Sequence, residues 1–300
     1  MKSWKGYLAS AILVGFTATT GTSVRPAVSP ASALQQFYTT GWAQWSNGKY
    51  TKAYATFENG LRLARKRISV EYEAEFLTGI AESCWKLERY PEDLAAAKQA
   101  LVLYEGLENV RGTMITLDDL SDVEENLDDY PDALRDAQRE LTLARRLNDL
   151  TEESSALTNI GLADVDIGNY AEGLKIYQQG LALDRQRQKD EDIATDYGNI
   201  SDAEEDLGLY GDALRDGRAK LTLARQMKDL SAEAEAYSSI ADVEDDIGQY
   251  GSALRDEEQA LGTAQKSGDV QGEADDLGEI GSIQVDLGQN TATQQTRSVR

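Results

Sequence analysis

The sequence predicts an all-α solenoid, in which antiparallel helix pairs stack one after another along the chain. Three observations support this fold. Apolar residues recur at spacings of three and four, as they do on one face of an amphipathic helix. Only four prolines occur in 300 residues, so few positions interrupt a helix. Tyrosine recurs at intervals of forty residues, at Tyr50, Tyr90, Tyr130, Tyr170, Tyr210 and Tyr250.

The N-terminal segment, residues 1–33, differs in character from the rest. Lys2 and Lys5 precede an apolar run from Tyr7 to Ala18, which is followed by a segment rich in Thr, Ser and Pro. This layout predicts a secretory signal peptide, so we expect export to the bacterial periplasm or the extracellular space. The run is shorter than the roughly 20 residues that a membrane-spanning helix needs. Retention of the segment as a single membrane anchor is the alternative.

An internal repeat follows this segment. Nearly the same seven residues occur three times, at 130–136, 210–216 and 250–256. A repeat unit of this length cannot bury its apolar side chains alone, so consecutive units must stack. We therefore expect one continuous core, with each unit touching mainly its neighbours.

Each unit is predicted to hold two helices, one before its tyrosine and one after it. The apolar stripe before Tyr250 comprises Tyr237, Ile240, Val243 and Ile247. Glycine tolerates the left-handed conformation that often ends a helix, and it stands at the expected ends of first helices. These glycines are Gly168, Gly208, Gly248 and Gly288. Pro91 and Pro131 then begin the second helix, where a missing N–H costs nothing.

Small residues at one matched position of each unit would let its two helices approach closely. They are Gly41, Ala81, Ser121, Gly161, Ser201, Ala241 and Gly281. We expect the solenoid to span residues 34–288, with six helix pairs up to residue 268 and a single capping helix after them. The polar segment 289–300 lacks apolar periodicity and is predicted to be disordered.

On these residues the sequence resembles the tetratricopeptide repeat (TPR) family, in its longer variant of about forty residues that is seen in kinesin light chains and many bacterial proteins. The family's pattern of bulky, apolar and small residues followed by Gly-x-Tyr-x-x-Ala is filled by Tyr237, Ile240, Ala241, Gly248, Tyr250 and Ala253. The chain departs from the pattern where an aromatic residue is expected near the end of the first helix. Acidic residues stand there instead, namely Glu124, Asp164, Glu204 and Glu244.

The resemblance implies a right-handed superhelix whose first helices line a concave groove, and in relatives this groove holds extended peptides or helices of partner proteins. Transferred to this chain, the groove positions carry many carboxylates. The candidate binding acids are Asp122, Glu125, Asp202, Glu205, Asp242 and Asp245. Rows of carboxylates on a concave wall would attract an extended basic segment of a partner, or admit a neutral one. The alternative is that these residues only keep the surface soluble.

Two asparagines occupy equivalent groove positions one repeat apart, Asn159 and Asn199. In relatives, asparagine at this place grips the backbone of a bound peptide. An amide can do so because it both donates and accepts hydrogen bonds. Ordinary surface asparagine is the alternative.

The composition excludes several classes of function. A net charge of −23 opposes binding to nucleic acid and direct binding of the mature chain to an anionic membrane. The absence of histidine and the presence of one cysteine, Cys84, remove the usual catalytic pairs and metal clusters. We therefore expect no cofactor, no metal centre and no enzyme activity.

Two hypotheses about function remain. The first is an exported protein-binding module that captures a protein or peptide segment in an acidic concave groove. The second is an assembly scaffold in the cell envelope, which uses its convex or end surfaces and associates weakly with itself. An apolar stripe on the last helix would serve this second role, and it comprises Leu277, Ile280, Ile283 and Leu287.

Overall fold

A computed structural model describes residues 30–298, and within this range the chain forms thirteen α-helices and no β-strand. The first six helices are α1 (Pro30–Ser46), α2 (Tyr50–Arg67), α3 (Val70–Trp85), α4 (Tyr90–Gly106), α5 (Val110–Glu125) and α6 (Tyr130–Leu147). The remaining seven are α7 (Leu150–Asp166), α8 (Tyr170–Arg187), α9 (Asp190–Asp206), α10 (Tyr210–Met227), α11 (Leu230–Asp246), α12 (Tyr250–Ser267) and α13 (Val270–Ser298).

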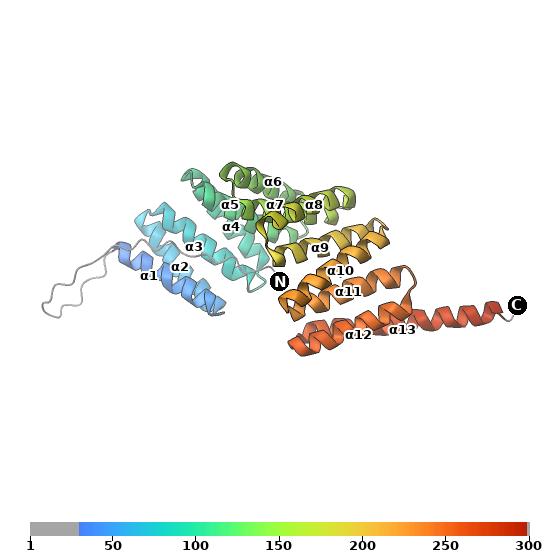
Figure 1. The fold of residues 1–300 in the computed structure, drawn as a ribbon. Coiled ribbons are helices and arrows are strands. Elements are labelled where there is room, and N and C mark those ends of the chain that lie inside the picture. The colour runs from blue at the N-terminus through green and yellow to red at the C-terminus, as the bar shows by residue number, and fades with distance from the viewer. Residues whose placement is uncertain (1–29, 299–300) are drawn as a thin grey trace.

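The helices stack in chain order along a curved path (Figure 1). Each helix packs against the helix before it and the helix after it. Odd-numbered helices also contact each other, since α1 touches α3, and α7, α9, α11 and α13 touch in sequence. The predicted all-α solenoid of stacked helix pairs is therefore confirmed. None of the helices in the described range is long and apolar enough to cross a membrane.

Two turns recur in every unit, and both use a left-handed residue. The turn inside a unit has positive φ at Gly168, Gly208 and Gly248, with values of 84°, 70° and 74°, as the sequence predicts. In other units Glu88 and Asp128 take this conformation at 57° and 59°, although they are not glycine. The turn between units also has a positive φ, at Ile68, Glu108, Asn148, Gln188, Lys228 and Gly268. Only the last of these six residues is a glycine, so this second turn has no glycine pattern in the sequence.

Close approach of the two helices in a unit is confirmed at the matched small residues. A Cβ atom at Gly41 would overlap the ring of Phe57, and one at Gly161 would overlap the ring of Tyr177. At Ser201 the side-chain hydroxyl instead donates a hydrogen bond of 2.9 Å to the carbonyl oxygen of Ala213. A small residue at this position thus lets the second helix rest directly on the backbone of the first.

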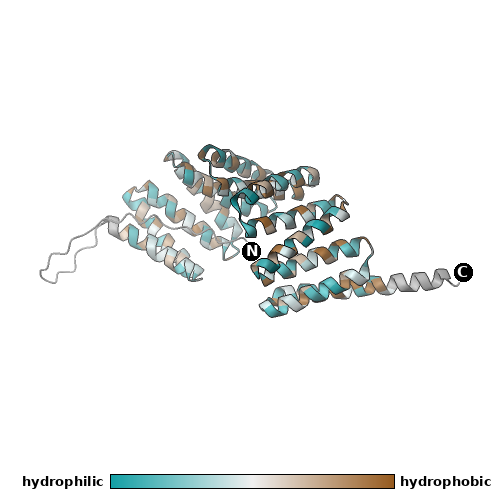
Figure 2. Cartoon of the chain, in the orientation of Figure 1, coloured by the Kyte–Doolittle hydropathy of each residue, from teal (hydrophilic) through white to brown (hydrophobic). Residues whose placement is uncertain are grey.

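The apolar core differs from the expected continuous one. A large cluster extends from α1 to α5 around Phe57 and Phe76, and three smaller clusters follow between α8 and α13. The reason lies in α6, which buries three alanines together with Asp136 and Glu140 and no large apolar side chain. Figure 2 shows the resulting mixture of hydrophilic and hydrophobic residues along the helices.

Both ends of the solenoid differ from the predicted boundaries. α1 begins at Pro30, and the rest of the predicted signal peptide lies outside the described residues. α13 continues to Ser298, past residue 288, where the solenoid was expected to end. Gly288 does not take a positive φ, and no proline follows it. Without a breaker, the helix continues past the point where its apolar periodicity ends.

Candidate functional site: acidic clusters on the odd-numbered helices

The candidate site lies on the odd-numbered helices, whose mutual contacts form the inner layer of the solenoid. Their carboxylates gather toward the C-terminal end in a group that we name the C-terminal acidic cluster. Its members are Asp202, Glu205 and Asp206 on α9, Asp242, Asp245 and Asp246 on α11, and Glu279 and Asp286 on α13. Four of the six predicted binding acids therefore fall within one cluster.

The carboxylates of this cluster act strongly on one another. Burial and the charges of Asp242 and Asp246 raise the pKa of Glu205 to about 7. Desolvation and the charge of Glu279 raise the pKa of Asp242 to about 6. The pKa of Asp245 is also raised, first by desolvation and then by Asp286. Like charges this close disfavour the ionised form, so part of the cluster retains protons near neutral pH.

Asp202 is exposed to solvent, yet desolvation by surrounding helices raises its pKa. Lys220 opposes the pKa rise of Asp202, but it also forms an ion pair of 3.6 Å with Glu235. Basic side chains of the chain itself therefore neutralise little of the negative charge of this cluster.

The predicted acid Asp122 belongs to a second group near the N-terminal end. Here Glu82 on α3 and Asp93 on α4 face Asp118, Asp119 and Asp122 on α5. Burial is the main cause that raises the pKa of Glu82 to about 7 and that of Asp93 to about 8, and neighbouring carboxylates add to it. The acidic wall thus consists of two clusters and not of uninterrupted rows.

The last predicted acid, Glu125, is half-buried and lies near the α8 side chain Tyr177. Its charge contributes to the raised pKa of that tyrosine, after the larger effect of burial. Glu125 therefore lies between the two acidic clusters.

The two predicted asparagines differ in their surroundings. Asn159 is only 1% exposed, and its Nδ2 donates a hydrogen bond of 3.1 Å to Oδ1 of Asp118. Asn159 is therefore not an ordinary surface asparagine, and the Ser155 and Asn159 side chains both bind Asp118. Asn199 is half-buried, and its Nδ2 atom is buried without a hydrogen-bond partner among the described residues. It lies one turn before Asp202 on the same helix, so an unsatisfied amide donor adjoins the C-terminal acidic cluster.

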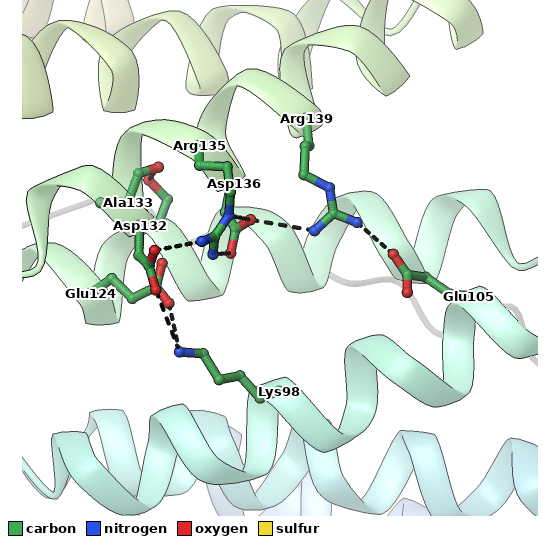
Figure 3. Close-up of polar contacts among 9 residues, drawn as sticks. Lys98, Glu105, Glu124, Asp132, Ala133, Arg135, Asp136 and Arg139 are labelled. Atoms are coloured by element: carbon green, nitrogen blue, oxygen red, sulfur yellow. Dashed lines mark hydrogen bonds and ion pairs between the residues drawn. The ribbon is translucent and has the colours of Figure 1, made fainter.

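A further set of acids, which the sequence did not identify as ion-paired, lies between the helices. Glu124, Glu204 and Glu244 replace the expected aromatic residue and are nearly inaccessible to solvent. Lys98 on α4 reaches Glu124 at 3.0 Å, and Arg218 on α10 reaches Glu244 at 3.5 Å. Figure 3 shows Lys98 directed toward Glu124 and Asp132, with Arg135 and Arg139 flanking the buried Asp136. Lys98 and Arg218 have partners on other helices, which the sequence pattern does not reveal, whereas Arg135 pairs with acids of its own helix α6.

The described side chains include no group of three or more acids or cysteines placed to hold a metal ion. Cys84 is fully buried in the N-terminal core cluster, as expected for a small apolar residue.

Comparison of the structure with known proteins supports the fold. Aspartyl phosphate phosphatase F from Bacillus subtilis is similar, with a TM-score of 0.61 and 14% identity, over 85% of this chain and 71% of that one. A Rap protein complexed with competence and sporulation factor gives a TM-score of 0.57 and 14% identity, over 87% and 77%. A signal transduction ATPase with a tetratricopeptide repeat sensor from Pyrococcus horikoshii gives 0.64 and 14%, over 90% of this chain and 44% of that one.

No protein-family model matches the sequence, and no curated protein matches it either. The similarity to solved structures therefore concerns the fold. The chain thus has a TPR-like fold, a solenoid of forty-residue helix pairs.

Proposed function

We propose that this chain is an exported, non-catalytic protein-binding module, and that it holds an extended basic segment of a partner against the C-terminal acidic cluster. The observation that carries this proposal is the cluster itself, in which Glu205 and Asp242 have raised pKa values and little cationic compensation. A Lys or Arg side chain placed among these groups would relieve their mutual repulsion and favour their ionised form.

Asn199 adds a contact for the main chain of such a segment. Its buried Nδ2 lacks an acceptor among the described residues, and an unsatisfied buried donor costs about 1 to 3 kcal/mol. Because the residue is half-buried, rotation of its amide would bring Nδ2 to the surface, where a carbonyl oxygen of a bound peptide would remove this cost. An amide that binds the main chain of a peptide and carboxylates that bind its Lys or Arg side chains together suit an extended basic peptide.

The similar structures support a binding role in general terms. One of them, a Rap protein, was solved as a complex with competence and sporulation factor. Export is supported only by residues 1–33, with two lysines before an apolar run.

The proposal is tested with a fluorescent lysine decapeptide and the full chain. We expect saturable binding that weakens about tenfold or more between 50 and 300 mM NaCl, because salt screens exposed charges. The variant Asp202→Asn/Asp242→Asn should bind the peptide several-fold more weakly. The matched control is Glu58→Gln/Glu258→Gln, which removes the same charge from exposed positions on α2 and α12.

Equal weakening in both variants would show that only net charge matters, and the groove proposal would then be wrong. Binding that does not respond to salt would contradict it equally.

A further inference from the structure

The last helix leaves an apolar stripe exposed to solvent. Val270, Leu277 and Val285 on α13 are 78%, 57% and 58% exposed. Small residues share this face at helical spacing, namely Ala274, Gly278, Gly281 and Gly288, and they too are exposed. No charged residue interrupts the stripe from residue 270 to residue 288. We name this set of seven residues the α13 stripe.

The opposite face of α13 packs against the solenoid. Ile283 is 3% exposed and lies in a cluster with Ala241 of α11 and Ala253 of α12. Three of the four residues expected to form an exposed end face, Ile280, Ile283 and Leu287, are thus buried or half-buried, while Leu277 faces solvent. The exposed surface consists of the α13 stripe instead.

Three residues of the α13 stripe have identical counterparts in α7, where another helix packs over them. Leu157, Gly161 and Val165 of α7 stand exactly three repeats before Leu277, Gly281 and Val285, and the two triplets are identical. In α7 the second helix of the unit, α8, covers Gly161 and Val165, and Leu157 is buried. The ring of Tyr177 lies where a Cβ of Gly161 would be, and Gly173 lies directly against the Val165 side chain.

On α13 nothing in the described part of the chain takes the place of α8. A Cβ atom added at Gly281 would meet no atom within 4 Å, and the same is true at Gly278 and Gly288. Leu157 is 2% exposed whereas its counterpart Leu277 is 57% exposed. A helix like α8, with a small residue and an aromatic residue four positions later, would therefore fit against this face.

Charge indicates which helices can dock there. Between residues 270 and 288, α13 carries five acids and no base, namely Glu273, Asp275, Asp276, Glu279 and Asp286. A second copy of this chain would bring these acids together and would add its own net charge of −23. A basic helix complements them, and α8 itself has three bases against two acids.

We propose that the α13 stripe is a docking site for a basic amphipathic helix of a partner protein, which completes the last repeat as α8 completes the fourth. The partner helix carries a Gly or Ala and, four residues later, a Tyr or Phe that fills the space over Gly281. The α13 stripe shares no residue with the C-terminal acidic cluster, although Glu279 and Asp286 of that cluster lie on the same helix and add to its negative charge.

The test uses a labelled peptide of residues 170–187 and the full chain in a fluorescence anisotropy titration. Gln178→Lys and Ala182→Glu, joined by a lactam bridge at two exposed positions, hold the peptide helical without altering its docking face. We expect saturable binding and a loss of at least tenfold when Tyr177→Ala is made in the peptide. The protein variant Leu277→Ser/Val285→Ser should also bind at least tenfold more weakly.

Val102→Ser is the matched control, because Val102 on α4 is an apolar side chain that is 66% exposed. It should bind the peptide as the parent does. Absence of saturable binding, or equal affinity of the stripe variant and the parent, would overturn the proposal. A chain that sediments as a dimer and becomes monomeric in the stripe variant would also overturn it, since the occupant would then be a second copy.

Discussion

Glu124 illustrates how single residues adapt the repeat. It occupies a position where the TPR pattern expects an aromatic ring, it is inaccessible to solvent, and Lys98 approaches it at 3.0 Å. Burial raises its pKa, and the ion pair with Lys98 opposes this rise. The ion pair with Lys98 thus offsets part of the free-energy cost of burying the Glu124 carboxylate between α4, α5 and α6.

Replacing this lysine should destabilise the fold in a pH-dependent way. We expect Lys98→Met to lower the free energy of unfolding by about 1 to 3 kcal/mol at pH 8, because Glu124 loses its cation. The loss should shrink at pH 5.5, where the carboxyl group can take up a proton. Urea denaturation at both pH values measures the effect. The double variant Lys98→Met/Glu124→Gln should recover most of the stability at pH 8, and a double variant no more stable than the single one would contradict this account.

Backbone strain offers a second residue-level prediction. Gln188 has φ of 56°, is exposed and lies in the turn between two units. A non-glycine residue pays roughly 1 kcal/mol in this left-handed region. Gln188→Gly should therefore raise the free energy of unfolding by about 0.5 to 1 kcal/mol, measured by urea denaturation. Gln188→Ala removes the same side chain but retains the strain, so an equal gain in that control would rule out the explanation.

The pairing of the helices was predicted correctly from the sequence, whereas the end of α13 and some contacts between helices were not. The forty-residue spacing of tyrosine and the turn glycines located helix pairs, because both depend on local backbone chemistry. The extent of α13 and the burial of Asn159 could not be inferred in this way. Asn159 is buried because Asp118 of another helix accepts its hydrogen bond, and such a contact leaves no periodic signal in the sequence.

The equivalent glycines Gly161 and Gly281 allow a matched test of helix pairing. Gly161→Ala should lower the free energy of unfolding by about 1 to 3 kcal/mol, since its Cβ would overlap Tyr177. Gly281→Ala should raise it by up to about 1 kcal/mol, because alanine favours helix and no described atom lies within 4 Å of its Cβ. Thermal denaturation of both variants measures whether each substitution lowers or raises the stability. A destabilising Gly281→Ala would show that α13 is covered.

For the whole molecule, the prevalence of acids predicts an unusual pH dependence. The pKa values of Asp93, Asp196 and Glu257 are raised to about 8, and those of Glu82, Glu204 and Glu205 to about 7. In each case burial is the first cause. Between pH 5.5 and 8 the folded chain therefore binds more protons than the unfolded chain, in which these groups are ionised.

The free energy of unfolding must consequently fall as the pH rises through this range. Each additional proton held by the folded state contributes about 1.4 kcal/mol per pH unit. We expect the Tm to be higher at pH 5.5 than at pH 8, and 0.5 M NaCl to raise the Tm at pH 8 because it screens repulsion. Differential scanning calorimetry between pH 5.5 and 8 measures whether the Tm falls or rises with pH. A Tm that rises steadily toward pH 8 would mean that these carboxyl groups are not protonated in the folded chain.

The most direct test of the acidic binding site is isothermal titration calorimetry with the lysine decapeptide at pH 6.5, in two buffers of different ionisation enthalpy. A cation that docks among Glu205, Asp242 and their neighbours lowers their raised pKa values, so binding should release protons and the measured heat should depend on the buffer. The affinity should also increase from pH 5.5 to pH 8. Binding whose heat is the same in both buffers, or no binding at all, would contradict the assignment of the C-terminal acidic cluster as the site.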